Sequence, residues 1–398
     1  MQYLSKIRSN VRWLPNYLWQ RATRKRDAGR VHVILSLADH FEPGIVPGKG
    51  SARAAKSEQE RRIETWFREI PRVLDRWRDA EGRPFYHTYF YPAEQYDPDL
   101  IEALAEHCRD GWGEVEIHLH HGVEAPDTRE HTEKQIIEFR DALAHKHGCL
   151  SQWNDAGPVR YAFVHGNFAL ANSKKGRACG VDSEMQVLCD TGCYADFTMP
   201  SAPDIAQVPK INSVYECGLP LDKRAPHRTG TDLEAGRPPR IFPLMIQGPL
   251  MLDFSRPAKG ARYPHIENGA LTWKYPANMK RFQLWRRAGI TVKGRPDWIF
   301  IKLHCHGMDP RDSDAMYGAP LREFLRELLE DSQKSGQYSV HFTTAREMTN
   351  MVLAACDGRD GNPGDYRDYR LKRIVSSVSS RPLEQKRKSH RTAVNASG

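Results

Sequence analysis

Three histidines lie within four positions of the sequence, in the stretch EIHLHHG at residues 116–122. In the alternating pattern of a β-strand, His118 and His120 point to one side of the strand and His121 points to the other. Two imidazoles on the same side can bind one divalent ion such as Zn²⁺. Histidine pairs also occur as surface or hydrogen-bonded residues, so this pair indicates a metal site only if further ligands join it.

Two other stretches contain groups that could complete such a site. SLADHFEP (36–43) places the carboxylate of Asp39 beside His40, and IKLHCHG (301–307) repeats the spacing of two with a further histidine pair. A catalytic zinc keeps three protein ligands and one open position for water, whose pKa it lowers to about 7. A carboxylate can accept the water's proton while a histidine protonates the leaving group. The residues that could supply one group for each task are Asp39, His40, His118, His120 and His304.

These residues must be positioned by strands and helices, which alternate roughly seven times along the chain. The clearest strand-like stretches are 31–39, 84–92, 114–120, 158–166 and 297–304. Such alternation predicts a parallel sheet, either an open doubly wound sheet or a barrel. The polar clusters follow the ends of the strands, and α/β barrels build their active sites at the carboxyl ends of strands. We therefore expect a barrel.

The order of these motifs resembles the polysaccharide deacetylase family, carbohydrate esterases with a distorted seven-stranded β/α barrel, over roughly residues 30–355. The resemblance implies that Asp39 is the general base and that His40 replaces a metal-binding acid. The family's second motif has two metal-binding histidines four residues apart. HLHHG has no histidine at position 122, so the expected ligands are His118 and His120, with His121 in reserve.

The remaining motifs of the resemblance concern the acid and the substrate groove. KLHCHG matches the final motif, which implies that His304 is the general acid. FVHGNFAL (163–170) stands where the family has an arginine-proline stretch, although the arginine is absent, and VHFTTAREM resembles the closing strand and helix of exopolysaccharide-cluster relatives. The residues expected to bind substrate are His121, His165, Asn167, Asp196 and His306.

Net charge and hydropathy limit the classes of partner. The net charge is +9, but residues 1–30 and 370–398 each carry eight Lys/Arg and one acid, which leaves about −5 on the body between them. A nucleic-acid enzyme carries its basic surface around its cleft, so we expect no nucleic-acid partner. The mean hydropathy of −0.66 and the lack of a long apolar run argue against a membrane span.

The two basic ends are expected to be extensions of the barrel. Residues 1–29 form an amphipathic basic segment that Pro15 should break or kink. Packing on the outside of its own domain is favoured for this segment, and peripheral contact of residues 1–25 with acidic lipid is the alternative. The barrel should span 30–358, and 359–398 should be a basic disordered tail.

We expect a metal-dependent hydrolase, with Zn²⁺ as the favoured ion, that removes N- or O-linked acetyl groups from a saccharide or polysaccharide precursor. The alternatives are a barrel hydrolase of the amidohydrolase or phosphoesterase type and a catalytically inactive saccharide-binding barrel. The N-terminus does not read as a secretory signal, and the eight cysteines contain no CxxC pair. The expected location is therefore the cytoplasm, with the inner face of the membrane as a further option.

Overall fold

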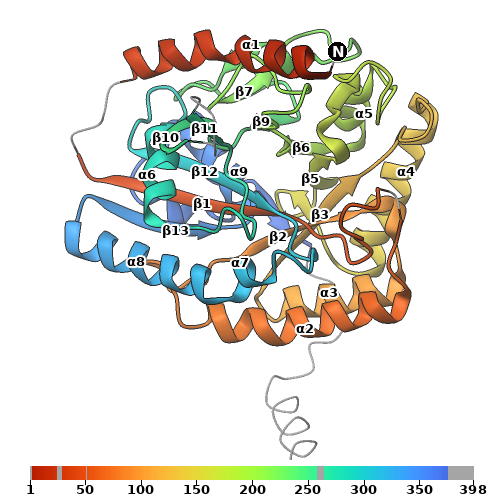
Figure 1. Ribbon diagram of the computed structural model, residues 1–398, viewed down its shortest axis with the longest axis horizontal. Helices are drawn as coiled ribbons and strands as arrows, with labels where there is room; N and C mark the ends of the chain where they lie inside the picture. The colour runs from red at the N-terminus through yellow and green to blue at the C-terminus, as the bar shows by residue number, and fades with distance from the viewer. Residues whose placement is uncertain (1, 25–28, 51, 258–263, 375–398) are drawn as a thin grey trace, which may run out of the picture.

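The computed structural model describes residues 2–24, 29–50, 52–257 and 264–374. Its centre is a largely parallel sheet flanked by helices, so the chain has an α/β fold (Figure 1). Along the sheet, the order of strands is β12-β1-β2-β3-β5-β6-β9-β7-β8, and β13 also pairs with β1. None of the pairings recorded between described strands closes the sheet, so the finer expectation of a barrel is not shown by the strand pairing.

The strands that matter for the site are parallel neighbours, which brings their carboxyl ends to one edge. They are β1 (Val31–His40), β2 (His87–Pro92), β3 (Gly113–Leu119), β5 (Val159–His165), β6 (Cys193–Asp196), β12 (Trp298–Cys305) and β13 (Tyr338–Thr343). In the register, Asp39 of β1 is opposite Cys305 of β12, and Leu119 of β3 is opposite His165 of β5. The predicted strand-end clusters therefore lie side by side.

The far end of the sheet is antiparallel. There β7 (Val214–Cys217) pairs with both β8 (Gly230–Asp232) and β9 (Leu244–Ile246), while β9 joins β6 in parallel. The remaining pairs are peripheral to the site: β10 (Met251–Pro257) with β11 (Pro264–Glu267), and β4 (Ser151–Trp153) with β14 (Leu371–Arg373).

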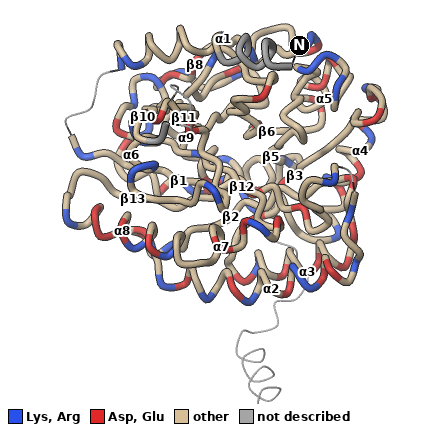
Figure 2. Tube along the Cα trace, viewed as in Figure 1, with Lys and Arg blue, Asp and Glu red and all other residues tan. Residues whose placement is uncertain are grey.

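Two apolar cores cover the two faces of the sheet. The first, which we call the helix-side core, lies under α2 (Lys56–Leu74), α3 (Pro98–Arg109), α4 (Arg129–Asp141), α5 (Glu184–Thr191), α6 (Met279–Arg287), α7 (Ser313–Tyr317) and α8 (Ala319–Ser335). The second, which we call the inner core, holds the wholly buried α9 (Ala345–Cys356) and side chains of α1 (Gln2–Thr23). Acidic and basic residues alternate along the outer helices α2 and α8 (Figure 2).

Side-chain alternation assigns each residue of a strand to one of these cores. In β1, Val33, Leu35 and Leu37 pack into the helix-side core, whereas Ile34 and Ala38 pack into the inner core. The same parity places Asp39 on the helix side and His40 on the inner side. This difference decides which of the predicted residues can meet.

The N-terminal segment forms one helix, α1, that runs through Pro15 without the predicted break. Trp13 and Tyr17 are buried against the body, and Asn16 and Gln20 donate hydrogen bonds to the carbonyls of Pro209 and Ile211. The helix therefore packs on its own domain. Its outward face leaves Val11, Leu18 and Trp19 exposed, and lipid contact by this face stays a prediction. Among the described helices, none is long and apolar enough to cross a membrane.

The packed body extends past residue 358, where the sequence placed its end. Arg367 is buried and Leu371 is inaccessible to solvent, and the strand β14 pairs with β4. The prediction of a disordered tail from residue 359 rested on basic composition. Composition does not show that a charged side chain such as that of Arg367 is buried against acidic partners elsewhere in the chain. Most of the predicted disordered tail, residues 375–398, lies outside the described residues.

Candidate metal centre

Five histidines gather on the inner side of the sheet, at the carboxyl ends of β12, β1 and β3, with β2 between the last two. The ring centroids of His40 and His118 are 5.0 Å apart, and those of His40 and His306 are 4.7 Å apart. His120 follows at 4.5 Å from His118, and the His304 ring is 6.2 Å from that of His40. The structure thus brings together the three predicted ligands and both histidines of the 301–307 stretch. We call this group, together with Glu42, the open centre.

Glu42 stands at the middle of this histidine group. Its Oε1 lies 3.6 Å from Nε2 of His118 and 4.0 Å from Nε2 of both His120 and His306. Tetrahedral ligands that bind one zinc at about 2.1 Å lie about 3.4 Å from one another, so the observed spacing leaves room for an ion. Sequence reasoning missed Glu42. Glu42 lies two residues after His40, and residues two apart in an extended chain point to the same side, as His118 and His120 do. This spacing could have indicated that Glu42 faces the histidines.

The outer nitrogens of two histidines have their own acceptors. Nδ1 of His118 donates to the carbonyl of Val164 at 2.7 Å, and Nδ1 of His120 donates to Glu94 Oε1 at 2.8 Å. The protons therefore lie on Nδ1, and the Nε2 lone pairs face Glu42. Nε2 of His118 is fully buried and has no hydrogen-bond partner in the described part of the chain. A buried lone pair next to a carboxylate, with its ring held by a second acceptor, suits a metal cation.

Electrostatics favour uncharged imidazoles at the centre of the group. Burial lowers the pKa of His40 well below its ordinary value, and His306, His118 and His304 lower it further. Burial and His120 likewise lower the pKa of His118. Burial by itself would raise the pKa of Glu42, but the close approach of His118, with His120 and His306 nearby, lowers it to about 2. His40 and His118 thus offer neutral nitrogens beside an ionised carboxylate, the forms that bind metal. His120 differs: burial lowers its pKa, but the hydrogen bond to Glu94 and the charge of Glu42 raise it overall.

The centre is open on one side. The His118 side chain is inaccessible, whereas the side chains of His120 and His306 are 22% and 36% exposed. Catalytic metal sites keep one position open to water or substrate, whereas structural sites are closed. An ion held here would be reachable from solvent between His120 and His306.

Asp39, the predicted general base, lies on the other face of β1. Its Oδ2 is 3.0 Å from Nδ1 of His87, and its Oδ1 accepts a hydrogen bond from the backbone N–H of Gly307 at 2.7 Å. Asp39 is fully buried among helix-side residues. The geometry therefore directs it away from the histidines, and it acts on them only by fixing the turn that follows His306.

The predicted substrate-binding residues fall into different places. His121 and His165 face each other in a second buried cluster, with ring centroids 4.9 Å apart, on the helix side of the sheet. Asp196 is also buried, and its carboxylate accepts hydrogen bonds from the backbone and hydroxyl of Thr198. Asn167 is exposed. Of this set, His306 is the residue that borders the open centre.

No protein-family model matches this chain, and no curated protein is detectably similar to it in sequence. The resemblance to polysaccharide deacetylases therefore rests on the order of the motifs alone. What the chain does has to be argued from the chemistry of its own residues.

Proposed function

We propose that the protein is a metal-dependent hydrolase that removes N- or O-linked acetyl groups from a saccharide, on a distorted β/α barrel like that of polysaccharide deacetylases. The observation that carries the proposal is the group of Glu42, His118 and His120, whose ligand atoms lie within 4.8 Å of one another on a solvent-accessible side. One carboxylate, two imidazoles and an open position form the donor set of a common class of catalytic zinc site.

The chain's own residues would divide the remaining work. A divalent ion bound here would polarise the acetyl carbonyl and acidify water. His304 lies on the same face, is buried, and has an Nδ1 without a hydrogen-bond partner among the described residues. Since Asp39 faces away, we assign both proton steps to His304, which would take a proton from water and return it to the leaving amine or alcohol. The ring of His40 lies near those of both His304 and His118.

An exposed aromatic ring beside the centre supports a saccharide substrate. Leu271 N donates to the carbonyl of His304 at 2.8 Å, so the segment carrying Trp273 runs beside that histidine. The backbone N–H of Trp273 is held by Asp312, and the residue is 54% exposed. The C–H groups on one face of a sugar ring pack well against such a flat apolar surface. Trp273 is therefore our candidate for the sugar platform.

All eight cysteines lie in the described ranges, and none of them forms a disulfide. Unpaired buried thiols fit a reducing compartment. We therefore propose a cytoplasmic site of action on an acetylated saccharide or a precursor of a polysaccharide.

The test is acetate release from N-acetylated and O-acetylated oligosaccharides by the Zn²⁺-loaded protein. We expect His304→Ala to keep its metal and to lose 10²–10⁴ in rate, the usual range for a positioned acid or base. Trp273→Ala should raise KM with little change in kcat. Asp39→Asn is the comparison variant, and a rate within about tenfold of wild type is expected because a side chain that only fixes a turn acts indirectly.

Two results would count against this function. A metal-loaded wild-type protein that releases no acetate from either class of sugar is not a deacetylase. A loss in Asp39→Asn as large as that in His304→Ala would return the base role to Asp39.

A second candidate is favoured by one observation, the sharing of Glu42 between two ligand groups. His40 and His306 form a further triplet with this carboxylate. A carboxylate with two imidazoles on each side is also how a bridged pair of metal ions is held in hydrolases of phosphate esters and amides. Two results would favour this alternative. Glu42→Gln would lose two equivalents of metal together, and the wild-type protein would cleave phosphodiesters without releasing acetate. The absence of both metal and activity would favour the inactive saccharide-binding barrel.

A further inference from the structure

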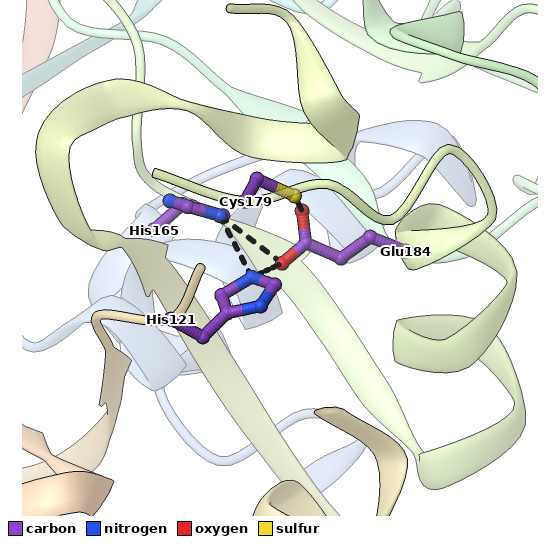
Figure 3. A group of neighbouring side chains, drawn as sticks. All are labelled: His121, His165, Cys179 and Glu184. Atoms are coloured by element: carbon purple, nitrogen blue, oxygen red, sulfur yellow. Dashed lines mark hydrogen bonds and ion pairs between the residues drawn. The ribbon is translucent and has the colours of Figure 1, made fainter. Parts of the chain in front are cut away.

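A second cluster of metal-binding side chains lies on the helix side of the sheet, apart from the open centre. Its members are His121, His165, Cys179 and Glu184, and all four are buried (Figure 3). His121 follows the end of β3, and His165 is the last residue of β5. Cys179 lies in the loop that connects β5 to α5, and Glu184 is the first residue of α5. We call this group the closed cluster. It joins the ends of two paired strands to the loop and the helix that follow them.

The ligand atoms converge. Nε2 of His121 is 3.0 Å from Nε2 of His165 and 2.8 Å from Glu184 Oε1, which is itself 3.2 Å from Nε2 of His165. The Cys179 Sγ lies 3.7 Å from Glu184 Oε2. Ligands around a tetrahedral zinc lie roughly 3.3–3.8 Å apart, so a shift of a few tenths of an ångström would admit the ion.

The proton positions show why these nitrogens need a cation between them. Nδ1 of His121 is 2.9 Å from Asp127 Oδ2, and Nδ1 of His165 donates to the carbonyl of Gly166. Both acceptors require a proton on Nδ1. In the neutral form of the two rings, the Nε2 lone pairs would therefore face each other and a carboxylate oxygen. Three such electron pairs at about 3 Å repel unless a proton or a metal ion lies among them. An imidazole held by a carboxylate on its outer nitrogen is the usual support of a zinc ligand.

The closed cluster also differs from the open centre in its access. The side chains of His165 and Glu184 are inaccessible to solvent, and that of His121 is 1% exposed. Four protein ligands without an open position define a structural zinc site, which contributes to folding and leaves no place for substrate. A proton shared between the histidines and Glu184, with the Cys179 thiol as a further donor to Glu184, is the alternative way to hold the group together, and metal content distinguishes the two arrangements.

The loop from His165 to Glu184 explains what such an ion would hold. Six of its residues other than glycine have φ between 46° and 57°, namely Asn167, Phe168, Ala171, Asn172, Lys175 and Ala178. Left-handed residues of this kind persist only when the surroundings fix them. Gly122, itself at φ 60°, lies so close to the backbone of Cys179 that a Cβ there would overlap it. The chain next to His121 is thus shaped to receive the Cys179 loop.

We propose that His121, His165, Cys179 and Glu184 bind one structural Zn²⁺ ion that fastens the 166–183 loop to the ends of β3 and β5. This assigns His121 and His165 a structural role in place of the substrate-binding role expected from the sequence. The proposal does not depend on the function of the open centre.

The test uses Co²⁺ in place of Zn²⁺, because a thiolate bound to Co²⁺ gives a near-ultraviolet charge-transfer band that imidazole and carboxylate ligands do not give. We expect the wild-type protein loaded with Co²⁺ to show this band. Cys179→Ser should lose it, and Cys193→Ser, which removes an equally buried thiol on β6, should keep it. His118→Ala, in the open centre, should lose one equivalent of metal and also keep the band.

Metal content gives a second readout, in which wild type and His118→Ala are compared without relying on the folding of Cys179→Ser. The wild-type protein should contain at least one equivalent of Zn²⁺ that is still bound in His118→Ala. Cys179→Ser should contain one equivalent of Zn²⁺ fewer than the wild-type protein. A wild-type protein without a thiolate band, or a band that survives in Cys179→Ser, would overturn the proposal. So would Zn²⁺ that is wholly lost in His118→Ala.

Discussion

The ring of His120 is oriented by Glu94, whose Oε1 accepts the Nδ1 proton at 2.8 Å. Glu94 itself does not face the ion position, so its effect on metal must pass through the histidine. We expect Glu94→Gln to weaken Zn²⁺ binding at the open centre by 10–100-fold, the usual effect of removing such a support. Competition with a chromophoric chelator measures this affinity directly.

A matched carboxylate–histidine pair elsewhere in the fold serves as the control. Glu102 lies 2.7 Å from Nδ1 of His147, on the helix side and away from the open centre. Glu102→Gln should leave the Zn²⁺ affinity of that centre unchanged. Equal weakening in both variants would show that the effect of Glu94→Gln comes from general destabilisation.

A buried carboxyl group behind His118 makes folding depend on pH. Burial raises the pKa of Glu116 to about 8 from its ordinary value of 4.5, against the hydrogen bonds from Tyr194 and the backbone of Ala162. Between these two values the folded protein binds the extra proton, so the contribution of Glu116 to stability is full below about pH 4.5 and is lost as the pH rises to about 8. The protein should therefore lose stability over this range.

Glu116→Gln tests this dependence because glutamine mimics the protonated side chain. Its oxygen can accept from Ala162 N while its amide donates to the Tyr194 oxygen. The variant should match wild type near pH 4.5 and exceed it by roughly 2–5 kcal/mol in free energy of unfolding at pH 9. Urea unfolding at both pH values measures the difference. The exposed Glu106→Gln should show no such divergence.

Among the structural elements, the segment 363–373 contributes one buried arginine of its own to the packed body. Arg367 pairs with Asp79 at 3.0 Å, Glu81 at 2.6 Å and Glu347 at 3.2 Å. Removing the cation would leave buried carboxylates without a partner. We expect Arg367→Met to cost about 3–5 kcal/mol in free energy of unfolding, measured by denaturant titration.

Arg370, three residues later, is the comparison. It pairs with Asp357 at 3.0 Å, but its side chain is 42% exposed, and exposed pairs contribute about 0–1 kcal/mol. Arg370→Met should therefore cost much less than Arg367→Met. Similar small losses in both variants would mean that the segment is peripheral to the fold, as the sequence suggested.

The elements themselves were largely predictable, because apolar periodicity marks strands and helices. The alternation rule also placed His118 and His120 on one side of β3 and His121 on the other, which agrees with their contacts. The same rule applies to Asp39 and His40, which also face opposite sides, but the resemblance to deacetylases assigned them to one site. Glu42 lies beyond the end of β1, where its spacing of two from His40 was the available signal, whereas Cys179 lies in an irregular loop that strand periodicity does not reach.

For the molecule as a whole, the two proposed metal sites differ in access, so we expect metal to be lost in two stages. A chelator should remove the ion of the open centre from the folded protein while the melting temperature changes little. The ion of the closed cluster should leave only when the protein unfolds, and its loss should lower the melting temperature, because metal bound to the folded state alone adds to stability. Metal analysis after chelation, paired with calorimetry, follows both stages. Release of all metal in one step without a change in melting temperature would contradict the expectation.

The adjacent pair His120 and His121 sends one imidazole to each face of the sheet, so a single peptide unit links the two sites. Substitutions nearby alter one site at a time, but an insertion or deletion of one residue in β3 would reverse the direction of every later side chain and empty both. Natural variants of this protein should therefore differ by exchanges of residues between positions 114 and 121, without any change in length there. The loop at 166–183 is not a strand, so a change in its length before Cys179 does not reverse the direction of the side chains that follow. We therefore expect insertions and deletions in this loop instead.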